Sequence, residues 1–177
     1  MEVIGLKQKY WNMYSQLNFD SHYLALFLKR YVFWSNLISV TLAVLTSGSV
    51  TAWVIWQSYP LVWAIIVAFS QIAFIIKDHL PFLKYISPLK YLLPELEKLL
   101  LDIDYTWEKI NHNSLSDNDI NDLVFDFEAK WLEIKEKYTP NLSLHSEKIR
   151  MCAHKTNMGY FAQKYNLIIE KGDNHAT

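Results

Sequence analysis

The most prominent pattern in the chain is a stretch without any charged side chain, which runs from Tyr31 to Ile76. One membrane-crossing helix takes about 20 mostly apolar residues, so this stretch has the length of two crossings. Pro60 lies inside it, and proline is tolerated at the start of a helix but poorly in its interior. The pattern therefore predicts a hairpin of two transmembrane helices, residues 31–55 and 61–76, joined by a short turn.

The basic residues around this stretch predict how the hairpin would be oriented. Lys29 and Arg30 precede the first apolar helix, Lys77 follows the second, and the turn between the helices carries no charge. Lysine and arginine concentrate on the cytoplasmic side of membrane proteins. We therefore expect both termini of the chain in the cytoplasm.

Three segments outside the hairpin have the spacing of amphipathic helices. Residues 92–110 and 120–138 each carry an apolar stripe, and residues 146–165 carry a weaker one. The link between the first two segments is short, so these helices are expected to pack antiparallel. Ser116 and Asp119 have the spacing of a capping box at the start of the second helix.

The N-terminal residues are also amphipathic, with aromatic side chains at helical spacing. They predict a helix that lies on the membrane surface. The expected fold class is an all-α membrane protein, with a two-helix transmembrane hairpin plus a cytoplasmic helical domain. The three predicted regions are residues 1–20, 21–80 and 81–177.

Composition argues against several classes of function. The formal net charge of −1 gives no general attraction to nucleic acids. Cys152 is the one cysteine, so neither an internal disulfide nor a paired-cysteine zinc site can form. The six histidines lack the spacing of metalloprotease ligands, and only four glycines are available for phosphate-cradling loops. We therefore predict no catalytic residues, no metal site and no cofactor.

The first apolar helix has small and polar side chains at four-residue spacing. Because an α-helix turns once in about 3.6 residues, such side chains share one face. Small and hydroxyl residues allow close helix–helix packing, and they can also line a water-filled pore made by several subunits. Both interpretations stay open. The candidate residues for either role, with an amide from the second helix, are Ser35, Asn36, Ser39, Ala43, Ser47, Thr51 and Gln71.

The C-terminal segment is basic, whereas the two helices before it are acidic. One interpretation is that a basic helix packs against acidic neighbours. The other is a site for a phosphate-bearing ligand of the nucleotide type, because lysine and arginine bind phosphates directly. The candidate ligand-binding residues are Lys148, Arg150, His154 and Lys155.

The layout resembles the SLATT family of bacterial two-span effectors over roughly residues 21–110. The shared features are a short N-terminal helix, the entry sequence Lys29-Arg30-Tyr31, two coupled spans and a helical region behind them. The resemblance implies a protein of the bacterial inner membrane that acts in antiviral defence by abortive infection. It also implies a partner nucleotidyltransferase, encoded nearby, that makes a nucleotide or oligonucleotide signal.

Two functions are therefore expected. The first is a pore or ion channel that disrupts the inner membrane and is gated by the nucleotide signal. The second is a non-channel, membrane-anchored helical adaptor or assembly protein. A two-helix hairpin cannot enclose a pore alone, so we expect a homo-oligomer in the lipid bilayer, and a tetramer as its size.

Overall fold

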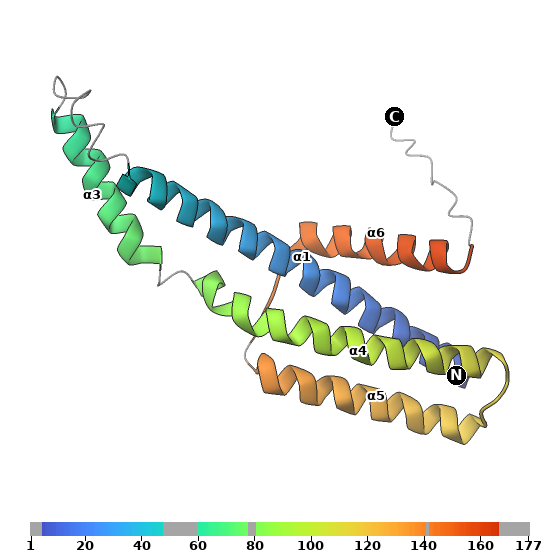
Figure 1. Cartoon of the computed structure of the whole chain (residues 1–177). Helices are drawn as coiled ribbons and strands as arrows, with labels where there is room; N and C mark the ends of the chain where they lie inside the picture. The colour runs from blue at the N-terminus through green and yellow to red at the C-terminus, as the bar shows by residue number, and fades with distance from the viewer. Residues whose placement is uncertain (1–4, 48–59, 78–80, 141, 167–177) are drawn as a thin grey trace. The chain divides into compact units, whose positions relative to one another are not determined.

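The computed structural model describes residues 5–47, 60–77, 81–140 and 142–166, and these residues are predominantly helical. Figure 1 shows the order of the elements along the chain. The elements are α1 (Leu6–Ser47), α3 (Pro60–Lys77), the short 3₁₀ helix η1 (Pro81–Tyr85), α4 (Ile86–Asn111), α5 (Asp117–Tyr138) and α6 (Glu147–Lys164). The predicted helices near 92–110, 120–138 and 146–165 are confirmed as α4, α5 and α6.

The chain divides into two compact units. The first, which we call the bundle, consists of Met1–Phe27 and Tyr91–Thr177, and the second consists of Leu28–Lys90. Helices α1 and α4 each contain residues of both units, because the boundaries fall within these helices.

The predicted transmembrane hairpin is wrong. Within the part of the chain that the structure describes, no helix is both long enough and apolar enough to cross a membrane. Helix α3 has 18 residues but begins at Pro60 and ends at Lys77, so its uncharged interior is shorter than the about 20 residues of a crossing. The described part of α1 ends at Ser47, not far beyond Arg30. The predicted location in the inner membrane, with both termini in the cytoplasm, is therefore wrong as well.

Many of the large apolar side chains described in the second unit are exposed. Leu42 of α1 and Ser70 of α3 are buried, but several neighbours on the same helices are exposed. These exposed side chains include Phe33, Val40, Val44, Leu61, Phe69 and Ile75. Burial of apolar surface is the main favourable term in folding, so the described residues of this unit contribute little of it.

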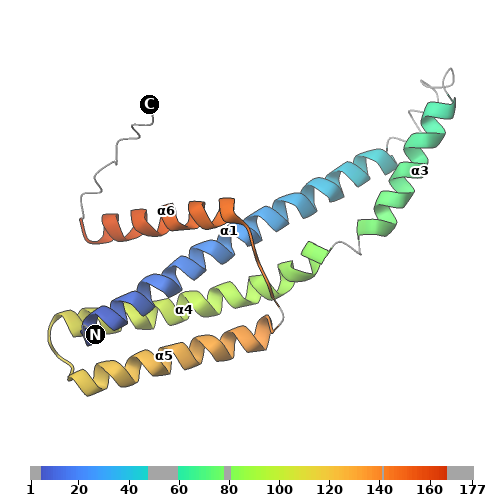
Figure 2. The same ribbon diagram turned by 180° about the vertical axis from the view of Figure 1, so that it is seen from behind.

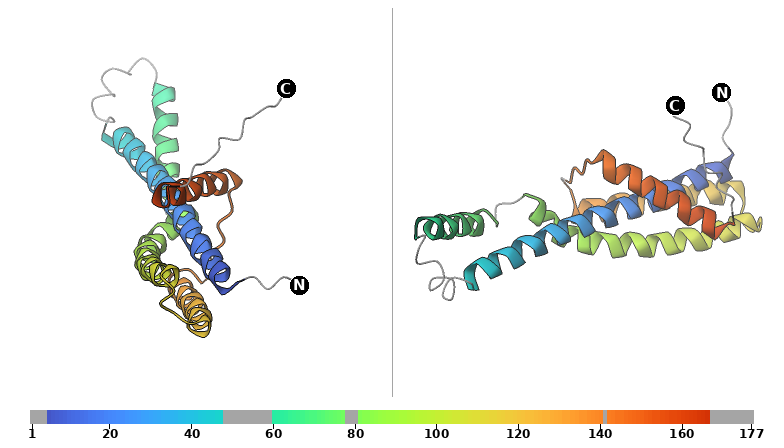
Figure 3. Two further views of the ribbon diagram at one scale, coloured as in Figure 1. Left: turned by 90° about the vertical axis from the view of Figure 1, so that its right-hand side faces the viewer. Right: turned by 90° about the horizontal axis from the view of Figure 1, so that it is seen from above.

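The bundle is built around the N-terminal part of α1. Figures 2 and 3 show this part of α1 with α6 on one side and the antiparallel pair α4 and α5 on the other. The antiparallel packing of α4 and α5 agrees with the prediction. Their apolar stripes meet inside the bundle, and the buried members are Leu92, Leu96, Leu99, Ile103 and Ile110 of α4 and Ile120, Val124, Phe127 and Trp131 of α5. The stripes are thus satisfied within one chain, and they no longer argue for a homo-oligomer, which stays a prediction.

Tyr10 shows why α1 belongs in the bundle and not on a membrane surface. Its side chain is fully buried, and its hydroxyl donates a hydrogen bond to the carbonyl oxygen of Ile103 at 2.8 Å. Its ring stacks on Trp107 and meets Phe127 edge-on, with centroids 6.0 and 6.2 Å away. The aromatic residues predicted to face lipid therefore pack against α4 and α5 instead.

The start of α5 has the predicted capping box. The backbone N–H of Asp119 donates to the hydroxyl oxygen of Ser116 at 3.3 Å, and the carboxylate of Asp119 accepts from the backbone N–H of Ser116 at 3.2 Å. Two backbone donors that the helix itself cannot satisfy are thereby paired.

Replacing Ser116 by alanine should lower the free energy of unfolding by about 1 kcal/mol, because one end of the box is lost. Urea denaturation followed by circular dichroism measures this change. Ser114→Ala is the matched control, since Ser114 is exposed in the same turn and only its backbone N–H takes part in a recorded bond, to Lys109. Equal losses in the two variants would contradict the capping role.

Candidate ligand groove between α1 and α6

Helix α6 packs on the bundle through one narrow face. Its buried side chains are Ile149, Ala153, Asn157 and Phe161, which follow one another at intervals of four residues. Side chains at this spacing lie above one another on one side of a helix. The remaining positions of α6 are exposed or partly exposed, so its buried contacts come from a single row of residues.

A pair of buried amides lies in the middle of this interface. The side-chain nitrogen of Asn18 donates to the side-chain oxygen of Asn157 at 3.0 Å, and both side chains are about 95 % covered. The side-chain nitrogen of Asn157 in turn donates to the carbonyl oxygen of Ser15 at 3.3 Å. Buried polar groups are costly when unpaired, and here α1 and α6 satisfy each other.

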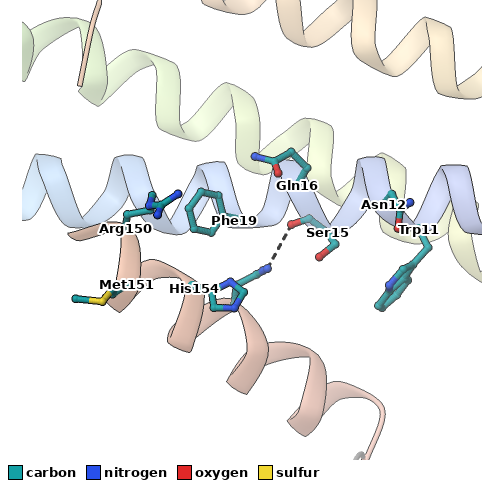
Figure 4. Close-up of a pocket in the computed structure, with 9 residues that line it drawn as sticks. Trp11, Asn12, Ser15, Gln16, Phe19, Arg150, Met151 and His154 are labelled. Atoms are coloured by element: carbon teal, nitrogen blue, oxygen red, sulfur yellow. Dashed lines mark hydrogen bonds between the residues drawn. The ribbon is translucent and has the colours of Figure 1, made fainter. Parts of the chain in front are cut away.

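A groove of about 700 Å³ runs beside the amide pair, with α1 as one wall and α6 as the other. Figure 4 shows how its side chains lie: Trp11, Ser15 and Phe19 come from α1, while Arg150 and His154 come from the first turns of α6. Pockets for small organic ligands have volumes of about 300–1,000 Å³. The full lining is Trp11, Asn12, Ser15, Gln16, Phe19, Arg150, Met151, His154 and Asn157.

Arg150 supplies the positive charge of the groove. Its Nη2 and Nε atoms donate to the carboxylate of Glu147 at 2.8 and 3.3 Å, and this hydrogen bond raises the pKa of the guanidinium. An arginine has five N–H donors, so the contact with Glu147 leaves donors for a ligand. The side chain is 63 % exposed, which makes these donors accessible from the groove.

Two amides of the α1 wall are held by neighbours one turn away. Gln16 donates from its side-chain nitrogen to Asp20 at 3.0 Å, and Asn12 accepts from the side chain of Gln8 at 2.9 Å. The bond that Asn12 accepts orients its amide so that the nitrogen is turned away from Gln8. The wall therefore combines aromatic rings with oriented hydrogen-bonding groups, as in many small-molecule sites.

The structure separates the four predicted ligand-binding residues. Arg150 and His154 line the groove, and their role in binding a ligand stays a prediction. Lys148 and Lys155 are exposed and do not belong to its lining. Sequence reasoning missed the α1 wall altogether, although Trp11, Ser15 and Phe19 have the four-residue spacing of one helix face. That spacing was the available signal, but it does not say what the face meets.

The basic residues of α6 also support the alternative interpretation, in which they pack on acidic neighbours. Lys164 contacts the carboxylate of Asp104 on α4, and the hydroxyl of Tyr14 donates to the same carboxylate at 2.9 Å. The packing interpretation therefore holds for Lys164, and the phosphate site stays a prediction. The N-terminal half of α6 carries the groove, and its C-terminal end carries the ion pair.

The residues proposed for a pore or a helix–helix contact lie in the second unit. Ser35 and Ser39 are partly buried in α1, whereas Asn36 and Ala43 are exposed. Gln71 of α3 is exposed, and the structure buries its neighbour Ser70 instead.

Two of the candidates cannot be placed in the same way. Ser47 is the last residue of α1, and Thr51 lies outside the described residues. Lining of a transmembrane pore is no longer proposed for any of these residues, because the hairpin is not supported. A close helix–helix contact along Ser35 and Ser39 stays a prediction.

Known proteins and metal chemistry give no further lead to the function. No family model, no curated protein and no solved structure matches the chain. Among the described residues, no group of three or more histidine, cysteine, aspartate or glutamate side chains could hold a metal ion. The resemblance to the SLATT family therefore stays a prediction.

His22 lies at the contact between α1 and α6, and we expect it to make this contact sensitive to pH. Its Nε2 atom is buried without a hydrogen-bond partner among the described residues, and its ring lies 6.0 Å from that of Tyr160 on α6. Burial disfavours the charged imidazolium and lowers the pKa of His22 from its usual 6.5. The contribution of neutral His22 to the free energy of unfolding is thus present above pH 6.5. It is lost as the pH falls through the lowered pKa that His22 has in the folded protein.

Backbone amide hydrogen exchange in α6, corrected for the intrinsic exchange rate, should therefore become faster as the pH is lowered from about 7.5 to about 5.5. Mass spectrometry of peptides from 147–164 measures this change. His22→Phe keeps an aromatic ring beside Tyr160 but cannot titrate, so it should remove most of the pH dependence. His154→Gln is the matched control and should keep it. A pH dependence that survives in His22→Phe would show that another group is responsible.

Proposed function

We propose that the bundle is a ligand-binding domain that receives a phosphate-bearing nucleotide in the groove between α1 and α6. One observation carries the proposal: Arg150 and His154 of α6 lie near Phe19 of α1 in a groove of suitable volume, and Trp11 of α1 lines the other end of that groove. Positive and hydrogen-bonding groups on one wall and aromatic rings on the other match the two parts of a nucleotide.

The chemistry of each wall supports this assignment. A guanidinium forms strong, charge-assisted hydrogen bonds with phosphate oxygens, and Arg150 is exposed to the groove. A base can stack on an aromatic side chain, and such a contact contributes about 1–3 kcal/mol per base. Asn12 and Gln16 add amide groups that can read the edge of a base or the hydroxyls of a sugar.

Binding at this position would act on two helices at once. A ligand that touches both α1 and α6 stabilises their packing, because it binds the docked arrangement and not the separated one. Helix α1 continues from the bundle into the second unit. The proposed role is therefore a sensor, in which occupancy of the groove changes the stability of a helix that both units share.

The resemblance to SLATT effectors supports a nucleotide as the signal and a partner nucleotidyltransferase as its source. In this proposal the chain senses the signal in an antiviral response. A second candidate is a helical adaptor that binds another protein through side chains exposed on the outer surface of the bundle. It is favoured by Leu101 of α4 and Phe125 of α5, which are 70 % and 57 % exposed.

Calorimetric titration of the full chain distinguishes these candidates. The probes are the four ribonucleoside triphosphates and a cyclic dinucleotide, each with inorganic pyrophosphate and the free nucleoside for comparison. The sensor proposal expects that at least one nucleotide binds more tightly than either of its parts. Absence of binding by every probe would refute it and favour the adaptor.

Arg150→Gln should weaken binding of that nucleotide at least about tenfold, which is 1.4 kcal/mol, because a charge-assisted contact to phosphate is lost. Lys155→Gln is the matched control, since Lys155 has the same charge on the same helix but does not line the groove. The affinity of the Lys155→Gln variant for the nucleotide should stay within about twofold of that of the parent. Equal weakening in the two variants would show general charge attraction and would contradict a site at Arg150.

A further inference from the structure

The C-terminal end of α6 is held by an ammonium group in an acidic and aromatic surrounding. Lys164 Nζ contacts the carboxylate of Asp104 and donates to the hydroxyl oxygen of Tyr14 at 3.3 Å. It also lies 5.9, 5.7 and 5.8 Å from the ring centres of Tyr14, Tyr160 and Tyr165. We call Tyr14, Asp104, Tyr160 and Tyr165 the ammonium cage.

The cage is partly shielded from solvent, with Tyr14 buried and Tyr160 exposed. Tyr14 is 1 % exposed, and the side chains of Lys164 and Asp104 are 24 % and 27 % exposed. Burial alone would lower the pKa of Lys164, but its hydrogen bond and charge interaction with Asp104 outweigh burial and raise it. Burial raises the pKa of Tyr14, so its hydroxyl keeps its proton and donates to Asp104. The cage therefore holds a positive charge against a single carboxylate.

The distances indicate which kind of cation the cage fits. Cation–π attraction extends to about 6 Å from a ring centre, so all three rings act near the limit of their range. The close contacts are hydrogen bonds from Nζ to Asp104 and Tyr14, and these need N–H groups. A primary ammonium has three such groups, whereas a quaternary ammonium has none. The cage is thus suited to a primary ammonium.

We propose that the ammonium cage is a binding site for primary alkylammonium groups and that Lys164 fills it as a tethered ligand. A free alkylammonium can then take the place of the lysine side chain. Lys164 is the last residue of α6, and the buried contacts of that helix come from one row of side chains. Occupancy of the cage therefore controls how firmly the C-terminal part of α6 is docked.

The consequence for ligand binding rests on the proposed function, because α6 is also a wall of the groove. Loss of the ammonium from the cage would loosen that wall and weaken nucleotide binding. The experiment below uses no nucleotide, so its outcome does not depend on whether the groove binds one.

The test is chemical rescue of Lys164→Ala. Alanine removes the three methylene groups and the ammonium beyond Cβ, and n-propylammonium is the fragment that restores them. Hydrogen exchange of peptides from 154–164 should be at least about tenfold faster in this variant than in the parent. Addition of n-propylammonium chloride should bring it back towards the parent rate. Because a tether provides an effective concentration in the millimolar range, the salt is supplied at about 50 mM.

Three controls make the result specific. Sodium chloride and tetramethylammonium chloride at the same concentration should not rescue, since neither cation offers N–H groups. Lys155→Ala removes an exposed lysine from the same helix and should exchange like the parent. Lys164→Met keeps most of the aliphatic stem and fills the space, so it should exchange faster than the parent without responding to n-propylammonium.

The exchange rates of these variants decide for or against the ammonium-cage proposal. Parent-like exchange in both Lys164→Ala and Lys164→Met would overturn the proposal, because the ammonium would then contribute nothing to docking. Equal rescue by all three salts would also overturn it and would indicate an effect of ionic strength. Rescue by n-propylammonium alone, with loss of that rescue in the double variant Lys164→Ala/Asp104→Asn, is the result that the proposal expects.

Discussion

Packing of the N-terminal part of α1 against three other helices is the constraint on which the rest of the structure depends. Tyr10 points towards α4 and α5, where its hydroxyl bonds to Ile103. Trp11, the next residue, points towards a different side and lies against Phe161 of α6, with ring centres 4.8 Å apart. Successive residues of a helix are turned by about 100°, so two neighbouring aromatic residues can anchor two different partners. The groove and the ammonium cage both exist because α1 occupies this central position.

The helices of the bundle could be predicted from the sequence because their periodicity is local. The stripes of α4 and α5 and the Ser116–Asp119 box depend on residues within a few turns of one another. The position of α1 could not be predicted in the same way. The helical spacing of Tyr10, Tyr14 and Leu17 is the same for a helix side that faces lipid and for one that packs on other helices. The charge-free residues that follow in the sequence favoured the interpretation in which this side faces lipid. The groove was not predicted: charge drew attention to Arg150 and His154, but nothing local linked them to Trp11 and Phe19.

The second unit shows why an uncharged stretch is a weak predictor of a membrane span. What crossing requires is one continuous apolar helix of sufficient length, and a count of residues without charge does not measure that. Helix α3 begins at Pro60 and ends at Lys77. The uncharged residues before it that the structure describes belong to α1, whose earlier residues are part of the bundle. Large side chains such as Phe69 stay exposed in this unit. Most of the buried apolar residues that the structure describes therefore lie in the bundle.

The buried amide pair fixes the register of α6 on α1. Apolar attraction is not directional, so the row from Ile149 to Phe161 would tolerate a shift of α6 by one turn along its axis. Such a shift would bring Ala153 or Phe161 opposite Asn18 and leave its amide buried without a partner. An unpaired buried amide costs about 1–3 kcal/mol, which favours a single alignment by about fivefold to about a hundredfold. Polar residues at one position of a coiled coil select an alignment for the same reason. One hydrogen bond between Asn18 and Asn157 thus decides which residues of α6 stand opposite which residues of α1, and so where Arg150 lies.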